Sequence, residues 1–192
     1  MKNRILVSLT LILSLVLSLS ACVVDPPVTP PEEPEILITL GNLYKDIAED
    51  YTLEITIESD MGHVVNETYV VKENSASIRV ERINGFIIDE NGIHAPDSYK
   101  TVTEQELTKA EKEAMGISLP NLQFSTNSLD KINSGKTKLR ATITSSESFF
   151  GKDLGVDNIP LTVEFDSNSI NVISFSYTTN DGSKVSVKYT FN

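Results

Sequence analysis

The chain has few residues that could cross-link it or bind a metal. It contains one cysteine, two histidines and no tryptophan in 192 residues. One cysteine excludes a disulfide framework within the chain. The histidines, His63 and His94, lie beside predicted turns and lack the spacing of a zinc motif, so we expect no metal site and no cofactor.

Basic residues are also scarce, with 16 Lys and Arg against 27 Asp and Glu and a net charge of −11. A surface this acidic repels phosphate groups, so we expect no nucleic-acid partner. It repels anionic lipid headgroups for the same reason. Any attachment to a membrane must therefore come from something other than a basic patch.

Motifs that carry catalysis are absent or incomplete. The stretch SGKT at 134–137 resembles the end of a phosphate-binding loop, but Asp130 stands where the first glycine is required. The stretch DSNSIN at 166–171 begins like a calcium loop, yet Ile170 and Asn171 replace an oxygen ligand and the turn glycine. No GxSxG nucleophile motif occurs. The sequence therefore predicts a protein that is not an enzyme.

The N-terminus, by contrast, carries a clear targeting pattern. Residues 1–21 combine the basic Lys2 and Arg4 with an apolar run from Ile5 to Leu19. About 15 apolar residues are fewer than the roughly 20 that a membrane-spanning helix needs. We interpret residues 1–21 as an export signal.

The single cysteine directly follows this signal. The tetrad Leu19-Ser20-Ala21-Cys22 resembles the lipobox of bacterial lipoproteins. The resemblance implies cleavage before Cys22 and attachment of a diacylglyceryl group to its sulfur. It also implies that the protein works outside the cytoplasm, on the outer face of the cytoplasmic membrane or, as the alternative, at an outer membrane. A second interpretation is an ordinary cleaved signal with an unmodified cysteine nearby.

A proline-rich segment separates this cysteine from the rest of the chain. Residues 22–35 contain five of the eight prolines together with four acidic residues. Such a segment favours the polyproline II conformation at about 3.1 Å per residue. We predict a tether that holds the folded part up to roughly 40 Å from the lipid surface.

Residues 36–192 form one predicted domain that consists mainly of β-strands. Alternating apolar and polar residues indicate strands, and a helical period indicates helices. The predicted strands are 51–57, 63–72, 75–82, 85–89, 137–145, 160–166, 170–179 and 183–191, with a short piece around 93–94. The predicted helices are 42–50, 104–115 and 126–132. The fold class is therefore α+β, mainly β: a large curled antiparallel sheet, or incomplete β barrel, of eight or nine strands covered by two or three helices.

Two local signals support particular elements of this prediction. Asn84-Gly85 is typical of a type I′ hairpin between strands 75–82 and 85–89. Thr103 and Glu106 form a capping-box pattern at the start of helix 104–115, and Gly116 is placed to end that helix.

The order of elements and the closing stretch LTVEFDSNSINVISFSYTTNDGSKVSVKYTF (161–191) resemble the LolA and LppX type of lipoprotein fold. That family carries lipids or lipoproteins in an apolar cavity between an incompletely closed barrel and its helices. The resemblance implies a lipid or other hydrophobic ligand here. The periplasmic carriers of the family are soluble, whereas a lipidated Cys22 would tether this chain.

The predicted ligand cavity is lined by apolar strand residues and by two adjacent aromatic residues. The candidates are Leu53, Ile55, Ile57, Val70, Ile78, Val80, Leu139, Ile143, Phe149 and Phe150. The two phenylalanines could instead plug the core, and their loop could form a lip over the cavity. The alternative function is a surface interaction or structural lipoprotein with a packed core and no small ligand.

Overall fold

The structure is a computed structural model that describes residues 34–59, 61–90 and 92–192. The predicted export signal, Cys22 and all but the last two residues of the predicted tether lie outside this range. Within it, no helix combines the length and the apolar character needed to cross a membrane.

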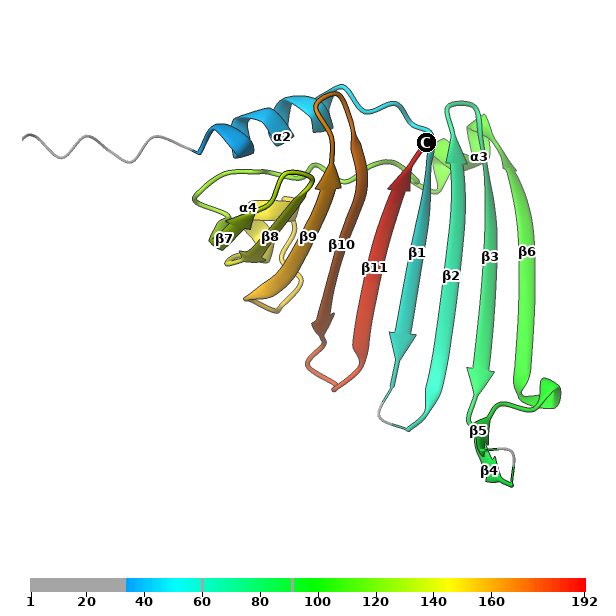
Figure 1. Cartoon of the computed structure of the whole chain (residues 1–192). Coiled ribbons are helices and arrows are strands. Elements are labelled where there is room, and N and C mark those ends of the chain that lie inside the picture. The colour runs from blue at the N-terminus through cyan, green and yellow to red at the C-terminus, as the bar shows by residue number, and fades with distance from the viewer. Residues whose placement is uncertain (1–33, 60, 91) are drawn as a thin grey trace, which may run out of the picture. The chain divides into compact units, whose positions relative to one another are not determined.

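Nine strands form one antiparallel sheet in the order β6-β3-β2-β1-β11-β10-β9-β8-β7 (Figure 1). Their bounds are β1 Tyr51–Glu58, β2 His63–Lys72, β3 Ser75–Asn84, β6 Lys100–Thr108, β7 Leu129–Ser134, β8 Lys138–Ile143, β9 Ile159–Phe165, β10 Ile170–Thr178 and β11 Lys184–Phe191. The first and last of these strands pair at the centre, with Leu53 opposite Tyr189. Strands β6 and β7 are the two edges, so the sheet is not closed into a barrel. The predicted fold class is confirmed.

The segment after β3 leaves the main sheet. Strands β4 (Ile87–Asp89) and β5 (Gly92–His94) form a separate two-stranded hairpin, followed by the 3₁₀ turn η1 (Asp97–Tyr99). The predicted hairpin at Asn84-Gly85 is wrong, because β4 pairs with β5 and not with β3. A type I′ turn needs positive φ at both central residues, and of these two only Gly85 has one, at +111°.

The described part contains three α-helices: α2 Glu35–Lys45, α3 Lys109–Ala114 and α4 Ser146–Phe150. Helix α2 begins seven residues earlier than the predicted helix 42–50. The apolar spacing extends upstream to Leu37 and Leu40, which are both fully buried. Pro34 precedes the first turn, where its missing N–H costs nothing and its carbonyl accepts a hydrogen bond from the Leu37 N–H at 2.8 Å.

Only residues 109–114 of the predicted helix 104–115 are helical, as α3, and residues 104–108 belong to the strand β6. Its residues pair with β3 in an unbroken register from Lys100 to Thr108. The Thr-x-x-Glu pattern occurs three times here, starting at Thr101, Thr103 and Thr108, and the last copy is the one that caps a helix. The Thr108 N–H donates to Glu111 Oε2 at 2.8 Å, and the Glu111 N–H donates to Thr108 Oγ1 at 3.4 Å. Long-range pairing with β3 therefore overrides the helical pattern of the preceding residues.

This capping box gives a direct prediction. Replacing Thr108 with alanine should lower the free energy of unfolding by about 1 kcal/mol, because the Glu111 N–H loses its acceptor. Thr108→Ser retains the hydroxyl and should lose less than about half of that amount. Urea unfolding measures both values. Equal losses in the two variants would contradict the capping role of this hydroxyl.

The predicted helix 126–132 is also wrong. Residues 125–128 form a turn, and β7 begins at Leu129, which lies opposite Ile143 on β8. The turn is held by the buried Ser128, whose hydroxyl donates to the Gln123 carbonyl at 2.6 Å. Leu129 therefore reaches the core from a strand.

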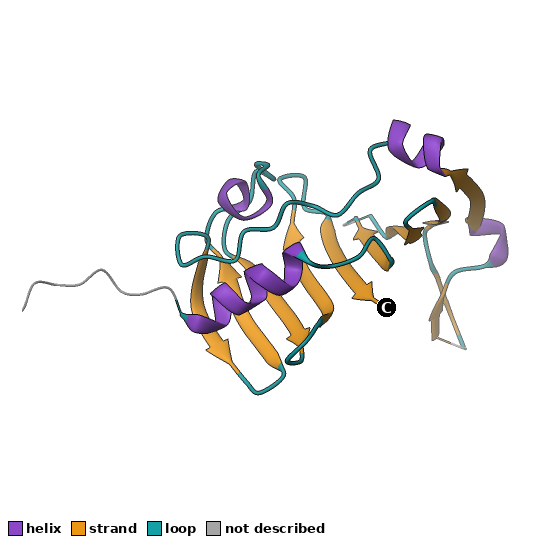
Figure 2. Ribbon diagram, turned by 90° about the horizontal axis from the view of Figure 1, so that it is seen from above, coloured by secondary structure: helices purple, strands orange, loops and turns teal. Residues whose placement is uncertain are grey.

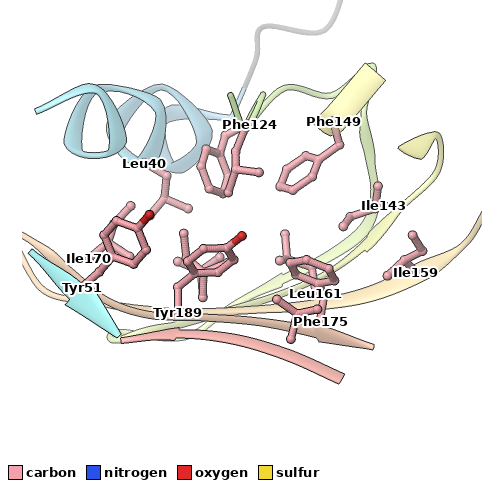
Figure 3. Close-up of a cluster of buried hydrophobic side chains, with 14 of the residues drawn as sticks. Leu40, Tyr51, Phe124, Ile143, Phe149, Ile159, Leu161, Ile170, Phe175 and Tyr189 are labelled. Carbon is pink, nitrogen blue, oxygen red and sulfur yellow. The ribbon is translucent and has the colours of Figure 1, made fainter. Parts of the chain in front are cut away.

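The hydrophobic core lies between one half of the sheet and its covering segments. Figure 3 shows Leu40 of α2, Phe124 and Phe149 facing Leu161, Phe175 and Tyr189 of the sheet. Helix α2, helix α4 and the segment 117–128 form this cover over β8, β9 and β10 (Figure 2). The short helix α3 contacts β3 and β6 at one end of the other half of the sheet.

Candidate functional site: an open apolar sheet face

One face of the sheet is mainly apolar from β8 to β3. The register places Tyr69 of β2, Leu53 of β1, Tyr189 of β11 and Ile173 of β10 in one row across the strands. Side chains in such a row point to the same side of a sheet, which here is the side of the core. The same face therefore extends beyond the area that the helices cover.

Burial differs between the two halves of this face. Under the cover, Leu139, Val163 and Ile173 are completely buried. On β1, β2 and β3 the side chains of Tyr51, Val71 and Ala76 on this side are buried too. Further along these strands most of the apolar side chains on this side are only half-buried, and we call this half-buried set the open face. It consists of Leu53, Ile55, Ile57, Val65, Tyr69 and Val80.

The structure divides the predicted cavity residues between the two halves. Leu53, Ile55, Ile57 and Val80 belong to the open face. Ile78 points to the same side and is 9% exposed. The remaining candidates on this side are Leu139, Ile143 and Phe149, which are fully buried in the core, and Phe150, which is half-buried.

Val70 points to the opposite side of the sheet. It lies opposite Thr52 on β1 and Ser77 on β3, whereas Tyr69 lies opposite Leu53. The sequence HVVNETYVVK of β2 places valines on both faces, so its own alternation does not show which side is apolar. Only the register with β1 decides this, and Val70 therefore does not line the same surface as the other candidates.

Sequence reasoning missed Val65, Glu67 and Tyr69 because the alternation within β2 does not show which of its two sides is the apolar side of the sheet. Glu67 stands on the open face opposite Ile55 and Val80, and the Tyr69 hydroxyl donates to Glu67 Oε2 at 2.9 Å. Burial, followed by the interaction with Glu67, raises the pKa of Tyr69 to about 12. The side of the sheet that carries the open face thus holds this hydrogen-bonded pair among apolar side chains, together with the exposed Arg82 opposite Val65.

The two phenylalanines of α4 belong to a chain of aromatic contacts. Phe149 packs edge-on against Phe124 with ring centroids 5.5 Å apart and against Phe150 at 5.0 Å. Phe150 in turn lies 4.9 Å from Phe175 of β10. With Phe149 fully buried, these contacts agree with the interpretation as a core plug.

The opposite face of the sheet is polar and carries shallow hollows. One, of about 520 Å³, is lined by ten residues, of which five are serine or threonine residues of β1, β9, β10 and β11. The exposed ion pair between Lys188 and Glu54, at 2.9 Å, lies on its border. This hollow offers hydroxyl groups beside Pro160, Phe175 and Val187.

Side chains that could hold a metal ion do not converge in the described part of the chain. No cluster of three or more His, Cys, Asp or Glu side chains occurs among these residues. His94 pairs with Asp89 at 3.6 Å in the β4–β5 hairpin. The buried Ser146 donates to Asp153 at 3.2 Å and accepts from the Leu154 N–H at 3.0 Å, so its hydroxyl shapes the loop after α4.

Exposed carboxylates at turns make the stability of the fold sensitive to acid. The backbone N–H groups of Asn168 and Ser169 lower the pKa of Asp166, and the Thr179 hydroxyl lowers that of Asp181. A lowered pKa in the folded state adds stability that is complete above the unfolded-state pKa. That stability is lost as the pH falls through the folded-state value.

We therefore expect the free energy of unfolding to decline as the pH falls below about 4. Urea unfolding at a series of pH values measures this decline. In the variant Asp166→Asn the slope should be smaller, because one of the contributing carboxylates is gone. An unchanged slope would contradict the contribution of Asp166.

Comparisons with known proteins give no family for this chain. No protein-family model matches it, and no curated protein does. Among solved structures it is similar to a redesigned β-barrel at 14% identity, covering 80% of this chain and 96% of that one, with a TM-score of 0.21. A second redesigned β-barrel, mFAP1 bound to DFHBI, is 13% identical, with 79% and 98% coverage and a TM-score of 0.21. With TM-scores this low, neither likeness contributes to the functional argument.

Proposed function

We propose that this chain is an exported lipoprotein, held to a membrane by lipid on Cys22, that binds a lipid or another hydrophobic ligand on its open face. The tetrad LSAC supports the anchor. The half-buried apolar side chains of β1, β2 and β3 support the ligand site. Under this proposal the protein has no catalytic role and belongs with the tethered branch of LolA-like and LppX-like proteins.

The observation that carries the ligand proposal is that the helices cover only part of one mainly apolar face of the sheet. Each methylene group of an acyl chain that leaves water gains about 0.8 kcal/mol. Four adjacent strands, from β3 to β11, span about 15 Å at the usual strand spacing. An extended apolar ligand lying across them would contact Val80, Tyr69 and Leu53 in turn, while the pair of Tyr69 and Glu67 offers polar contacts to its headgroup.

A charged side chain introduced on the open face by substitution tests this site. We expect Ile55→Glu to weaken the binding of a fluorescent fatty acid by about tenfold or more, since it places a carboxylate among the apolar contacts. The matched control is Thr178→Glu, which adds the same charge on the opposite face. Fluorescence titration measures both affinities. Equal affinities in the two variants, or no binding by the unmodified protein, would contradict the ligand site.

Growth with labelled palmitate tests the anchor separately. We expect label on the unmodified protein and none on Cys22→Ser, together with a shift of the variant from the membrane fraction to the soluble fraction. A lipid with two or three acyl chains anchors firmly, so the shift should be nearly complete. Equal label on both proteins would show that Cys22 is not the lipidation site.

A second candidate function is contact with another macromolecule, and one observation favours it. Met61, Ile88 and Ile93 are 78%, 79% and 72% exposed at the turn between β1 and β2 and on the β4–β5 hairpin. Phe86 and Tyr99, both also exposed, belong to the same region. If native mass spectrometry finds no lipid on the gently extracted protein and no fatty acid binds, this interaction function is favoured.

A further inference from the structure

The two edges of the sheet are protected unequally. Strand β7 has a break in register between Asp130 and Asn133, and Lys131 within it adopts φ +53°. A bulge of this kind hinders further pairing at an edge. Strand β6 has no such break over its nine residues, and in the described part of the chain nothing pairs with its outer side.

Strand β6 is also suited by composition to pair with another strand. All its residues except Leu107 are exposed, and Thr101, Val102 and Thr103 are β-branched. We propose that β6 of one molecule pairs antiparallel with β6 of a second copy, about a two-fold axis at Thr103. This inference goes beyond the proposed function and does not depend on lipidation of Cys22.

Charge complementarity favours this register. With Thr103 on the axis, Lys100 of each copy lies opposite Glu106 of the other, so two opposite-charge pairs form by symmetry. Glu106 has no ion pair within the described residues, whereas Glu104 is already paired with Arg79 at 3.3 Å. Lys100 pairs with the fully exposed Asp97 at 3.2 Å, and it would exchange or share this exposed contact on dimerisation. An axis at Glu104 would instead place two glutamates opposite each other, which is destabilising.

The number of paired residues points to the same axis. An axis at Val102 would place Lys100 opposite Glu104 instead of Glu106. It would align only residues 100–104 of the two strands. The axis at Thr103 aligns residues 100–106. Because antiparallel strands gain hydrogen bonds along their whole overlap, the longer overlap is favoured.

Such a pairing joins the two sheets and places both open faces on the same side. Thr103 points to the side of Val80, and its counterpart in the second copy points to that side too. The dimer would therefore present the two open faces next to each other on one continuous sheet.

Disulfide cross-linking of the full chain in its membrane tests this arrangement. In the variant Thr103→Cys the two thiols face each other within the range of a disulfide. In the control Gln105→Cys, on the same strand and face, each thiol is four residues away from its counterpart, about 13 Å. We expect cross-linking through position 103 to be about ten times faster than through 105. The unmodified chain contains only Cys22, so its cross-linking rate is the background that is subtracted from the rates of both variants.

Exchanging the charged pair tests the register in a second way. Lys100→Glu and Glu106→Lys each turn both ion pairs into like-charge pairs and should weaken dimerisation by about four- to 25-fold, taking two- to fivefold for each pair. The double variant restores both pairs and should dimerise like the unmodified chain. Analytical ultracentrifugation in detergent measures these constants. A double variant as weak as the single ones, equal cross-linking through positions 103 and 105, or a protein that stays monomeric would overturn the proposal.

Discussion

Truncation of Phe149 to alanine is expected to lower the free energy of unfolding by about 3–5 kcal/mol, one of the two largest losses that we predict. Phe149 is fully buried and contacts the rings of Phe124 and Phe150. Removing its ring deletes buried apolar area and leaves a cavity between α4 and the sheet, which the rigid strands cannot collapse to fill.

The matched control for this truncation is Phe86→Ala. The Phe86 side chain is 44% exposed near the β4–β5 hairpin, so its loss should cost less than about 1 kcal/mol. Urea unfolding of both variants gives the comparison. Similar losses at the two positions would show that α4 does not plug the core and would favour the interpretation of its loop as a lip.

Replacing Lys112 with methionine is expected to lower the free energy of unfolding by about 3 kcal/mol. The Lys112 side chain is only 4% exposed, and its ammonium group donates to three oxygens. These are Glu49 Oε2 at 2.5 Å and the carbonyls of Lys72 and Glu73 at 2.9 and 3.2 Å. Methionine preserves most of the apolar stem but leaves these acceptors without their donor.

Helix α3 supplies its own control for this prediction. Lys109→Met changes an exposed lysine in the first turn and should alter the free energy of unfolding by less than about 0.5 kcal/mol. Equal effects of the two substitutions, measured by urea unfolding, would show that the three contacts of Lys112 add nothing to stability. The expected difference would show that this lysine fastens α3 to the turn between β2 and β3.

The strands were largely predictable because their information is local. In β1 and β11 the apolar residues alternate on one face only, so the segments 51–57 and 183–191 were identified from the sequence. The misassigned segment 104–108 shows the limit of this reasoning. The Thr-x-x-Glu pattern that starts at Thr103 is compatible with a helix start, and only hydrogen bonding to β3, a distant partner, makes this segment a strand.

The candidate site was predictable in part. Leu53, Ile55 and Ile57 were identified because β1 is polar on its other face. The side on which Val70 and Tyr69 lie could not be identified, since both faces of β2 carry apolar residues. A shift of one residue exchanges the two faces of a strand, and pairing with β1 fixes that choice.

The sequence by itself determined a mainly antiparallel β domain and the LSAC pattern at Cys22, since periodicity and short motifs are properties of neighbouring residues. Only the tertiary structure decided that β1 and β11 join the two halves of the sheet, and that α2 and α4 cover one half and leave much of the other open. Both features depend on contacts between residues far apart in the chain. Local patterns do not encode which strands become neighbours or which part of a sheet a helix covers.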